Sequence, residues 1–443
     1  MKNEYKPGQG NRNQTPRRRK RKRAGLGLAL AGILLALVVA TAFGLASCIN
    51  NTAPASSGGG SQSQPASLPA SVPVSSSEPE PEPEPEEQRV RFSAVGDNLI
   101  HSAVYASAAS HYTGSEASGY DFNFCYEPSK YFFEDYDVNW INQESLISAM
   151  PASTYPNFNT PVELGQAAFD AGFNVFALSN NHTYDKLAAG ITATREFWNT
   201  APDGIINYGL YTNTTDGSGI PVQEMNGMTI AYVAFTDHTN GIPTPSGAPE
   251  VVIYTSEYAA MEAKVRAAHE LADVVVVSVH WEVENSHNVT QTQRDLAANF
   301  ANWGADVVIG THPHVVQELE WITSDDGRQV LVAYSLGNFL SAQSQPDQLI
   351  GMALTFDLVQ VVDPDGTRSP LAVENVKVYP TVTQYEYYGG QYYSDPRTYM
   401  FRDYTDEMAS VHPVRGKNGS FGRAYIQSVM EAYVPAEFLV LNW

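Results

Sequence analysis

The chain has 443 residues, of which 43% are hydrophobic and 17% are charged, enough for one large folded domain or two ordinary ones. Ten of its 26 Lys and Arg residues lie in the first 23 positions, so 16 basic residues face 47 acidic ones in the rest of the chain. So acidic a body repels the phosphate backbone, and we therefore expect no nucleic-acid partner.

The N-terminal segment has the pattern of a membrane anchor. Residues 17–23 are all Arg or Lys, and the next 23 residues, Ala24 to Ala46, carry no charge. A helix of that length rises roughly 35 Å, which spans the hydrocarbon core of a bilayer. We therefore predict a basic cytoplasmic tail over 1–23, a transmembrane signal-anchor over 24–47 and a body on the extracellular face of the cell membrane.

A cleaved signal peptide is the alternative interpretation of this segment. Leu45-Ala46-Ser47-Cys48 resembles a bacterial lipoprotein signal, in which cleavage leaves a lipidated Cys48 at the new N-terminus. In either interpretation the body is tethered to the outer face of the membrane.

Residues 48–88 have the composition of a disordered linker. They are rich in Ser, Gly, Gln and Pro and end in a Glu-Pro repeat from Glu78 to Glu87, so they offer little apolar surface to bury. The Glu-Pro part favours extended polyproline II, further extended by like charges, and we interpret the segment as a spacer.

The pattern becomes globular at Arg89, where short β-branched runs alternate with segments of helical spacing. This order predicts an α/β fold, and two later runs without intervening helices predict antiparallel strands. The predicted strands are 90–95, 138–142, 174–178, 229–235, 274–279, 307–309 and 330–334, the later runs are 352–361 and 371–378, and the predicted helices are 162–171, 186–199, 256–272 and 290–303.

We place one domain at 89–380 and a Tyr-rich C-terminal appendage at 381–443. Seven tyrosines lie between Tyr385 and Tyr404, and they suit either an aromatic lid that packs on the domain or a platform for a glycan or peptide. We favour the lid. Cys125, among three aromatic residues, is interpreted as a small buried hydrophobic residue.

Polar side chains follow six of the predicted strands. The carboxyl ends of strands in α/β sheets form the crevice where ligands bind, so these side chains are expected to converge. The segments are Gly96-Asp97-Asn98, Asn142-Gln143-Glu144, Asn180-Asn181-His182, His280-Trp281-Glu282, Thr311-His312-Pro313-His314 and Ser335 to Phe339.

These residue types indicate a metal site. Because the chain has only two cysteines, a thiolate site is excluded, and Asp, Glu, Asn and neutral His are ligands of hard or borderline divalent ions. Six or seven such ligands around one crevice suit two ions that share a bridging carboxylate.

The order of these motifs resembles the calcineurin-like metallophosphoesterase superfamily, and within it the bacterial capsule synthesis proteins of the CapA/PgsA type, associated with poly-γ-glutamate. The resemblance covers roughly residues 89 to 345. It implies a β-sandwich flanked by helices and a metal-dependent hydrolase. The motifs are Gly96-Asp97, Asn142-x-Glu144, Asn180-Asn181-His182-x-x-Asp185, His280-Trp281, Gly310-x-His312-Pro313-His314 and Ser335-Leu336-Gly337-Asn338-Phe339.

The resemblance also implies the role of each residue. Glu144 would bridge two divalent ions, Mn, Fe or Zn, and His182 would be the acid beside the leaving group, oriented by Asp185. The remaining ligands would be Asp97 and His314 for the first ion, and Asn181, His280 and His312 for the second.

The sequence departs from the wider superfamily at two positions. Leu99 stands where those enzymes have a His, and His101, two residues further on, is either a ligand or the first residue of a helix. Glu144 stands where they have a bridging Asp, so the spacing and affinity of the ions would differ.

Three functions are compatible with these features. The first is a metal-dependent hydrolase in capsule biosynthesis or export that acts on the capsule polymer or its precursor. The second is a general extracellular phosphoesterase. The third is a non-catalytic scaffold that holds other subunits of a capsule synthase together.

Overall fold

The computed structural model describes residues 84–115, 119–387 and 393–443. The predicted cytoplasmic tail, the anchor and nearly all of the linker lie outside these residues. No helix within the described ranges is long and apolar enough to cross a membrane. The described residues all belong to one compact unit, which spans 79–443.

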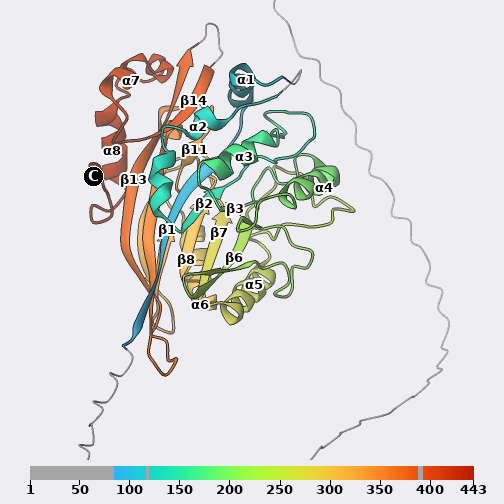
Figure 1. Ribbon diagram of the computed structural model, residues 1–443, viewed down its shortest axis with the longest axis vertical. Helices are drawn as coiled ribbons and strands as arrows, with labels where there is room; N and C mark the ends of the chain where they lie inside the picture. The colour runs from blue at the N-terminus through green and yellow to red at the C-terminus, as the bar shows by residue number, and fades with distance from the viewer. Residues whose placement is uncertain (1–83, 116–118, 388–392) are drawn as a thin grey trace, which may run out of the picture. The chain divides into compact units, whose positions relative to one another are not determined.

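The larger sheet contains eight strands and includes both the first strand of this unit, β1, and its last three strands, β12 to β14. The order is β14-β13-β12-β1-β2-β3-β4, with β11 paired to β1 (Figure 1). β1 to β4 are parallel, whereas β12, β13 and β14 continue the sheet antiparallel from β1. The strands are β1 Glu86–Asn98, β2 Val138–Asn142, β3 Val175–Ala177, β4 Ile206–Tyr208, β11 Asn338–Leu340, β12 Ile350–Val362, β13 Ala372–Tyr387 and β14 Tyr393–Met400.

The second sheet has six strands in the order β5-β6-β7-β8-β10-β9. The four central strands are parallel, and a short antiparallel strand closes each edge. Its strands are β5 Val222–Met225, β6 Met228–Thr236, β7 Val274–His280, β8 Val307–Thr311, β9 Leu319–Thr323 and β10 Gln329–Ala333.

Helices pack on both sheets (Figure 1). The α-helices are α1 Ser102–His111, α2 Asn123–Tyr126, α3 Glu163–Asp170, α4 Leu187–Trp198, α5 Tyr258–Leu271, α6 Gln291–Trp303, α7 Asp406–Val411 and α8 Arg423–Tyr433. Short 3-10 helices occupy Lys130–Asp135 (η1), Pro346–Leu349 (η2) and Pro413–Gly416 (η3). Thr290 begins α6 with a capping box to Gln293, and Gly304 ends it in a left-handed conformation.

Three apolar clusters hold these layers together. One lies between the sheets and contains residues of both, such as Phe92 and Trp140 of the first sheet and Val276 and Ile309 of the second. A second cluster packs α1 to α4 on the outer face of the larger sheet, and a third packs α5 and α6 on the smaller one. The predicted α/β class is therefore confirmed, with two mixed sheets that share a core.

The C-terminal segment is continuous with the larger sheet. The boundary drawn at residue 380 falls inside β13, and β14 adds the next strand. Tyr385, Tyr404 and Phe421 belong to the cluster between the sheets. These side chains are fully buried, so this part of the tyrosine-rich stretch packs in the core.

Close backbone contact at Gly96 fixes the end of β1. The amide of Asp97 donates to the carbonyl oxygen of Gly337 at 2.9 Å, and a Cβ at Gly96 would lie 1.8 Å from that same oxygen. Only glycine leaves room for this approach.

We expect Gly96→Ala to destabilise the fold by at least about 3 kcal/mol, because two hydrogen-bonded backbones would have to separate. Gly419→Ala is the matched control, since nothing lies within 4 Å of a Cβ there. Urea unfolding of both variants measures the difference. Equal stabilities would show that the chain accommodates the methyl group and that the contact is not limiting.

Candidate metal and acid–base site

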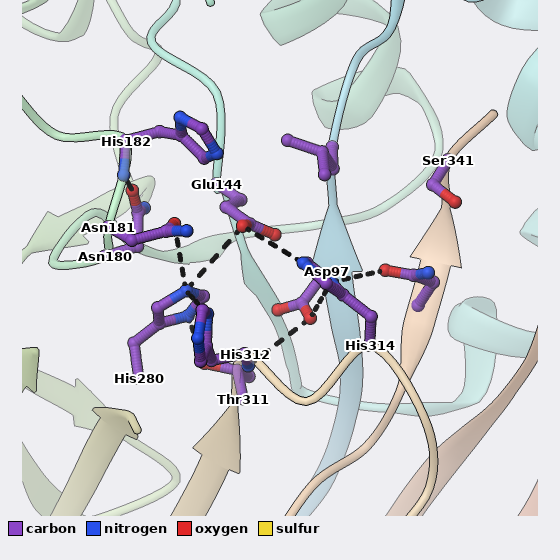
Figure 2. Close-up of polar contacts among 12 residues, drawn as sticks. Asp97, Glu144, Asn180, Asn181, His182, His280, Thr311, His312, His314 and Ser341 are labelled. Atoms are coloured by element: carbon purple, nitrogen blue, oxygen red, sulfur yellow. Dashed lines mark hydrogen bonds and ion pairs between the residues drawn. The ribbon is translucent and has the colours of Figure 1, made fainter. Parts of the chain in front are cut away.

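The six segments singled out in the sequence meet at one edge of the two sheets. β1, β2 and β3 of the larger sheet and β7 and β8 of the smaller one all run parallel and deliver their carboxyl ends there. Figure 2 shows the resulting cluster, with Glu144 between Asp97 and His314 on one side and His280 and Asn181 on the other. The residues that it draws around Glu144 come from segments more than 200 positions apart.

Asp97 and His314 form the first half of the cluster. Nδ1 of His314 lies 3.0 Å from Oδ2 of Asp97 and 3.0 Å from Oδ1 of Asn338. Both oxygens accept, since the amide group of Asn338 donates elsewhere, so Nδ1 carries the proton. Nε2 of His314 is then left to face Oε1 of Glu144 at 3.7 Å.

Asn181, His280 and His312 form the second half. Nε2 of His280 lies 3.1 Å from Oδ1 of Asn181, 3.0 Å from Nδ1 of His312 and 3.6 Å from Oε1 of Glu144. The other nitrogen of His280 contacts the Thr311 hydroxyl at 2.9 Å. Three potential ligand atoms therefore lie within 3.6 Å of Nε2 of His280.

Glu144 lies between the two halves of the cluster, and its carboxylate lacks hydrogen bonds within the described ranges. It is 1% exposed, and neither carboxylate oxygen has a hydrogen-bond partner among the described residues. Burial raises its pKa well above the ordinary value, and the negative charge of Asp97 raises it further. Ligand atoms of Glu144, His312 and His314 lie within 4.8 Å of one another. A cation fits here, because it would satisfy both oxygens and the facing imidazoles.

The three histidines differ in their protonation. Burial lowers the pKa of His280 and His312 well below the usual value, and their neighbouring histidines add to this effect, so both are neutral imidazoles. Burial also disfavours charge on His314, but Glu144 and Asp97 outweigh it and raise its pKa to about 10. The proton on His314 thus supplies the positive charge that the buried carboxylates require in the protein alone.

The loop after β8 holds its histidines in an unusual backbone conformation. His312 and His314 have φ of 96° and 58°, a region that non-glycine residues seldom adopt. At Gly310 a Cβ would lie 2.0 Å from the carbonyl oxygen of Tyr334. Gly310 is the residue before the end of β8, so the strand that leads into this loop is held close to the residue that follows β10. Backbone strain of the kind seen at His312 and His314 is typical of functional sites.

His182 and Asp185 form a separate pair beside this cluster. Nδ1 of His182 lies 2.7 Å from Oδ2 of Asp185, which also accepts from the amide of Phe158 at 2.6 Å. Because a carboxylate only accepts, Nδ1 carries the proton and Nε2 is the atom free for proton transfer. The Phe158 ring packs edge-on against His182 at 4.6 Å and fixes its plane.

The structure thus brings together all eight residues predicted from the sequence. His101 lies next to them, because its ring meets the Phe158 ring edge-on at 5.3 Å and that ring also packs against His182, but it forms no hydrogen bond or ion pair with the eight among the described residues. His101 precedes α1, its Nδ1 contacts the carbonyl oxygen of Leu99, and burial lowers its pKa to about 4. His238 and Asn240 also lie beside these residues, although they were not among the predicted site residues. The signal was available, since both follow the end of β6 as the other site residues follow their strands.

Glu144→Gln is expected to abolish tight metal binding and to stabilise the metal-free protein. Because the pKa of Glu144 is raised on folding, its carboxyl group costs stability as pH rises above the unfolded value, and the neutral amide avoids this cost. We expect a gain of about 1–3 kcal/mol at pH 8 that shrinks towards pH 5. Urea unfolding with a chelator and metal analysis after gel filtration measure the two effects.

Glu284→Gln is the control for this prediction. Glu284 is an exposed carboxylate whose charge acts on Glu144 and His314, and it should leave both properties nearly unchanged. If Glu144→Gln were less stable than the parent at pH 8, the carboxylate would not destabilise the metal-free protein, and the prediction would be wrong.

Comparison with known proteins places this site in a family. Residues 91–343, more than half of the chain, match the family described as "Bacterial capsule synthesis protein PGA_cap". The "PGA biosynthesis protein CapA" of Bacillus subtilis (strain 168) is 31% identical over 175 residues, 39% of this chain and 44% of that protein. The "Capsule biosynthesis protein CapA" of Bacillus anthracis is 33% identical over 189 residues, 41% of this chain and 43% of that protein.

Each alignment therefore spans less than half of the relative. Among solved structures, that of Haemophilus influenzae NAD nucleotidase matches 79% of this chain and 60% of its own, with a TM-score of 0.39 and 11% identity. The family match contains all eight site residues, from Asp97 to His314. The chain accordingly belongs to the PGA_cap family of bacterial capsule synthesis proteins.

Proposed function

We propose that this protein is a membrane-tethered extracellular protein of poly-γ-glutamate capsule biosynthesis or export, and that its site is a metal-dependent hydrolase of the metallophosphoesterase type. The observation that carries the proposal is the buried Glu144 carboxylate, which has no hydrogen-bond partner among the described residues and faces imidazoles from two directions. A buried carboxylate with a purely structural role is expected to be paired or hydrogen-bonded, because an uncompensated buried charge costs several kcal/mol.

Two divalent ions suit the arrangement of ligand atoms. Glu144 lies between the two halves of the cluster, and its Oε1 faces an imidazole of each half, at 3.6 Å from Nε2 of His280 and 3.7 Å from Nε2 of His314. The first ion would be held by Asp97 and His314, and the second by Asn181, His280 and His312. When bound, such ions polarise a phosphoryl or carbonyl oxygen and make water a nucleophile at neutral pH. Mn, Fe and Zn fit this mixed nitrogen and oxygen set.

The ligand residues are supported by their own partners. Asn142 donates to Oδ1 of Asp97 at 2.7 Å, and Thr311 contacts Nδ1 of His280 at 2.9 Å. Partners of this kind fix the orientation of a ligand and the tautomer of an imidazole. The chain thus holds its donor atoms in place before any ion arrives.

His182 supplies the proton for the leaving group in this proposal. Its Nδ1–H is held by Asp185, so Nε2 carries the second proton when the ring is positively charged and releases it to the substrate. Asp185 stabilises that positive charge, and the buried Phe158 ring excludes water from one side.

His182→Ala should lower the rate about 10² to 10⁴-fold on an alkyl phosphate ester and less on p-nitrophenyl phosphate, whose leaving group needs little protonation. Metal content should stay unchanged, whereas Glu144→Ala should lose both metal and rate. Steady-state kinetics of the metal-loaded protein on both esters and on γ-glutamyl polymer measure this. His111→Ala, which removes a histidine paired with Asp395 elsewhere in the molecule, is the matched control.

The scaffold hypothesis makes the opposite prediction. If the metal-loaded parent turns over neither phosphate esters nor γ-glutamyl polymer, and both variants still support capsule formation in cells, the catalytic assignment is wrong.

The proposed location rests on the basic run at 17–23 and the uncharged segment at 24–46. Protease added to intact cells should remove the body and leave a small anchored stub. Protection of the body in sealed cells would contradict the proposed orientation. Mass analysis separates the two kinds of anchor, because a diacylglyceryl group on an N-terminal Cys48 identifies a lipoprotein and an intact basic N-terminus excludes it.

A further inference from the structure

The loop from Asp237 to Gly241, which follows β6, borders the site and has no part in the reaction proposed above. The amide of Asp237 donates to the carbonyl oxygen of His280 at 2.8 Å. Thr239 is buried, and its hydroxyl contacts the carbonyl oxygen of Ile242 at 2.6 Å and the Tyr254 hydroxyl at 2.9 Å. The loop is therefore anchored to the same strand end that carries His280.

Asn240 reaches across to the acid–base pair. Its Nδ2 lies 3.3 Å from Nδ1 of His182, and its Oδ1 accepts from Nδ2 of Asn181 at 3.5 Å. Asn240 is itself exposed. An exposed side chain therefore contacts both Asn181, a proposed metal ligand, and His182, the proposed acid.

His238 carries a hydrogen-bond donor next to the same group of residues. Its ring meets that of His312 edge-on at 5.1 Å, and its Nδ1 accepts from the backbone amide of Asn240 at 3.2 Å. Because a backbone N–H only donates, Nδ1 is unprotonated and Nε2 carries the proton in the neutral ring. Nε2 has no hydrogen-bond partner within the part of the chain that the structure describes, and the residue is half-buried.

The charged groups around the site are negative, so an N–H donor there would favour the binding of an anionic substrate. Among the described residues, no lysine or arginine forms an ion pair or hydrogen bond with the eight site residues. Glu284 adds a negative charge that acts on Glu144 and His314. Neutral N–H donors next to the eight site residues are therefore the groups that we consider for binding an anionic group of the substrate.

We propose that His238 and Asn240 bind an anionic oxygen of the substrate, a phosphoryl or carboxylate oxygen, and thereby place the leaving group beside His182. The inference rests on the proposed function, since it assigns the substrate contacts of that same site. A hydrogen bond from an N–H group to a charged oxygen typically changes affinity by roughly 10- to 100-fold.

The test is calorimetric titration of the metal-loaded full-length protein in detergent with two probes, inorganic phosphate and γ-glutamylglutamate. His238→Gln keeps a donor near the position of Nε2, whereas His238→Asn keeps an acceptor near the position of Nδ1 and loses the outer donor. We expect His238→Asn to weaken probe binding at least 10-fold and His238→Gln to stay within about 3-fold of the parent. Metal content should be unchanged in both.

Asn240→Gly removes the second contact and preserves the backbone, because Asn240 has a positive φ of 52° that glycine adopts freely. Asn226→Gly is the matched control, since Asn226 has φ of 50° and lies in a turn between β5 and β6. We expect at least a 10-fold loss of probe affinity for Asn240→Gly, a matching rise in KM, and no change for the control.

The outcomes separate the two proposals. A parent that binds metal and a probe, with His238→Asn and Asn240→Gly binding equally well, overturns the inference and leaves the proposed function intact. The same holds if His238→Gln is weakened and His238→Asn is not, since the role of His238 would then be to hold the loop. A parent that binds neither metal nor probe overturns both proposals. Loss confined to phosphate identifies a phosphate ester, and loss confined to the dipeptide identifies the polymer.

Discussion

The burial of the Glu144 carboxylate is the constraint on which the rest of the site depends. A charge in a low-dielectric interior costs several kcal/mol unless an opposite charge or a set of donors compensates it. Here the protein alone supplies a proton on His314 and leaves both oxygens of Glu144 without hydrogen bonds. The architecture concentrates polar groups around this carboxylate, because parallel strands from two sheets end next to it. Glycines at positions 96 and 310 let the neighbouring backbones approach closely enough to enclose it.

Position relative to this carboxylate gives each neighbouring histidine a different chemistry. His314 lies between two carboxylates and keeps a proton, whereas His280 and His312 lie among other imidazoles and stay neutral. His182 is set apart from this group by its hydrogen bond to Asp185, which leaves its Nε2 free for the proton transfer proposed above. One residue type thus occupies three electrostatic environments, and the immediate partner of each imidazole sets where its protons lie.

The C-terminal segment supports the site from behind. His287, in the loop that follows His280, stacks on Tyr433 of α8 at 4.1 Å and contacts Asp347 at 3.2 Å. The next residue, Gln348, accepts from the side chain of Asn338, the partner of His314. The last helix therefore braces two of the segments that carry histidines. This connection explains why β13, β14 and α8 are built into the same core as the strands that bear the ligands.

The sequence by itself determined the nine predicted strands and the polar segments that meet at their carboxyl ends, because each has a local signature. A strand buried on both faces is a continuous apolar run, as in Val274–Val279, and the polar residues that follow mark its end. The sequence did not indicate β4, β5, β9 or β11, which are three to five residues long and depend on pairing with their neighbours, nor β14, the edge strand that pairs with β13. Tertiary structure alone decided that β13 and β14 continue the main sheet beyond residue 380, that His314 is the protonated imidazole and that Asn240 reaches His182. These properties depend on distances between segments far apart in the chain, and no local pattern of residues encodes such distances.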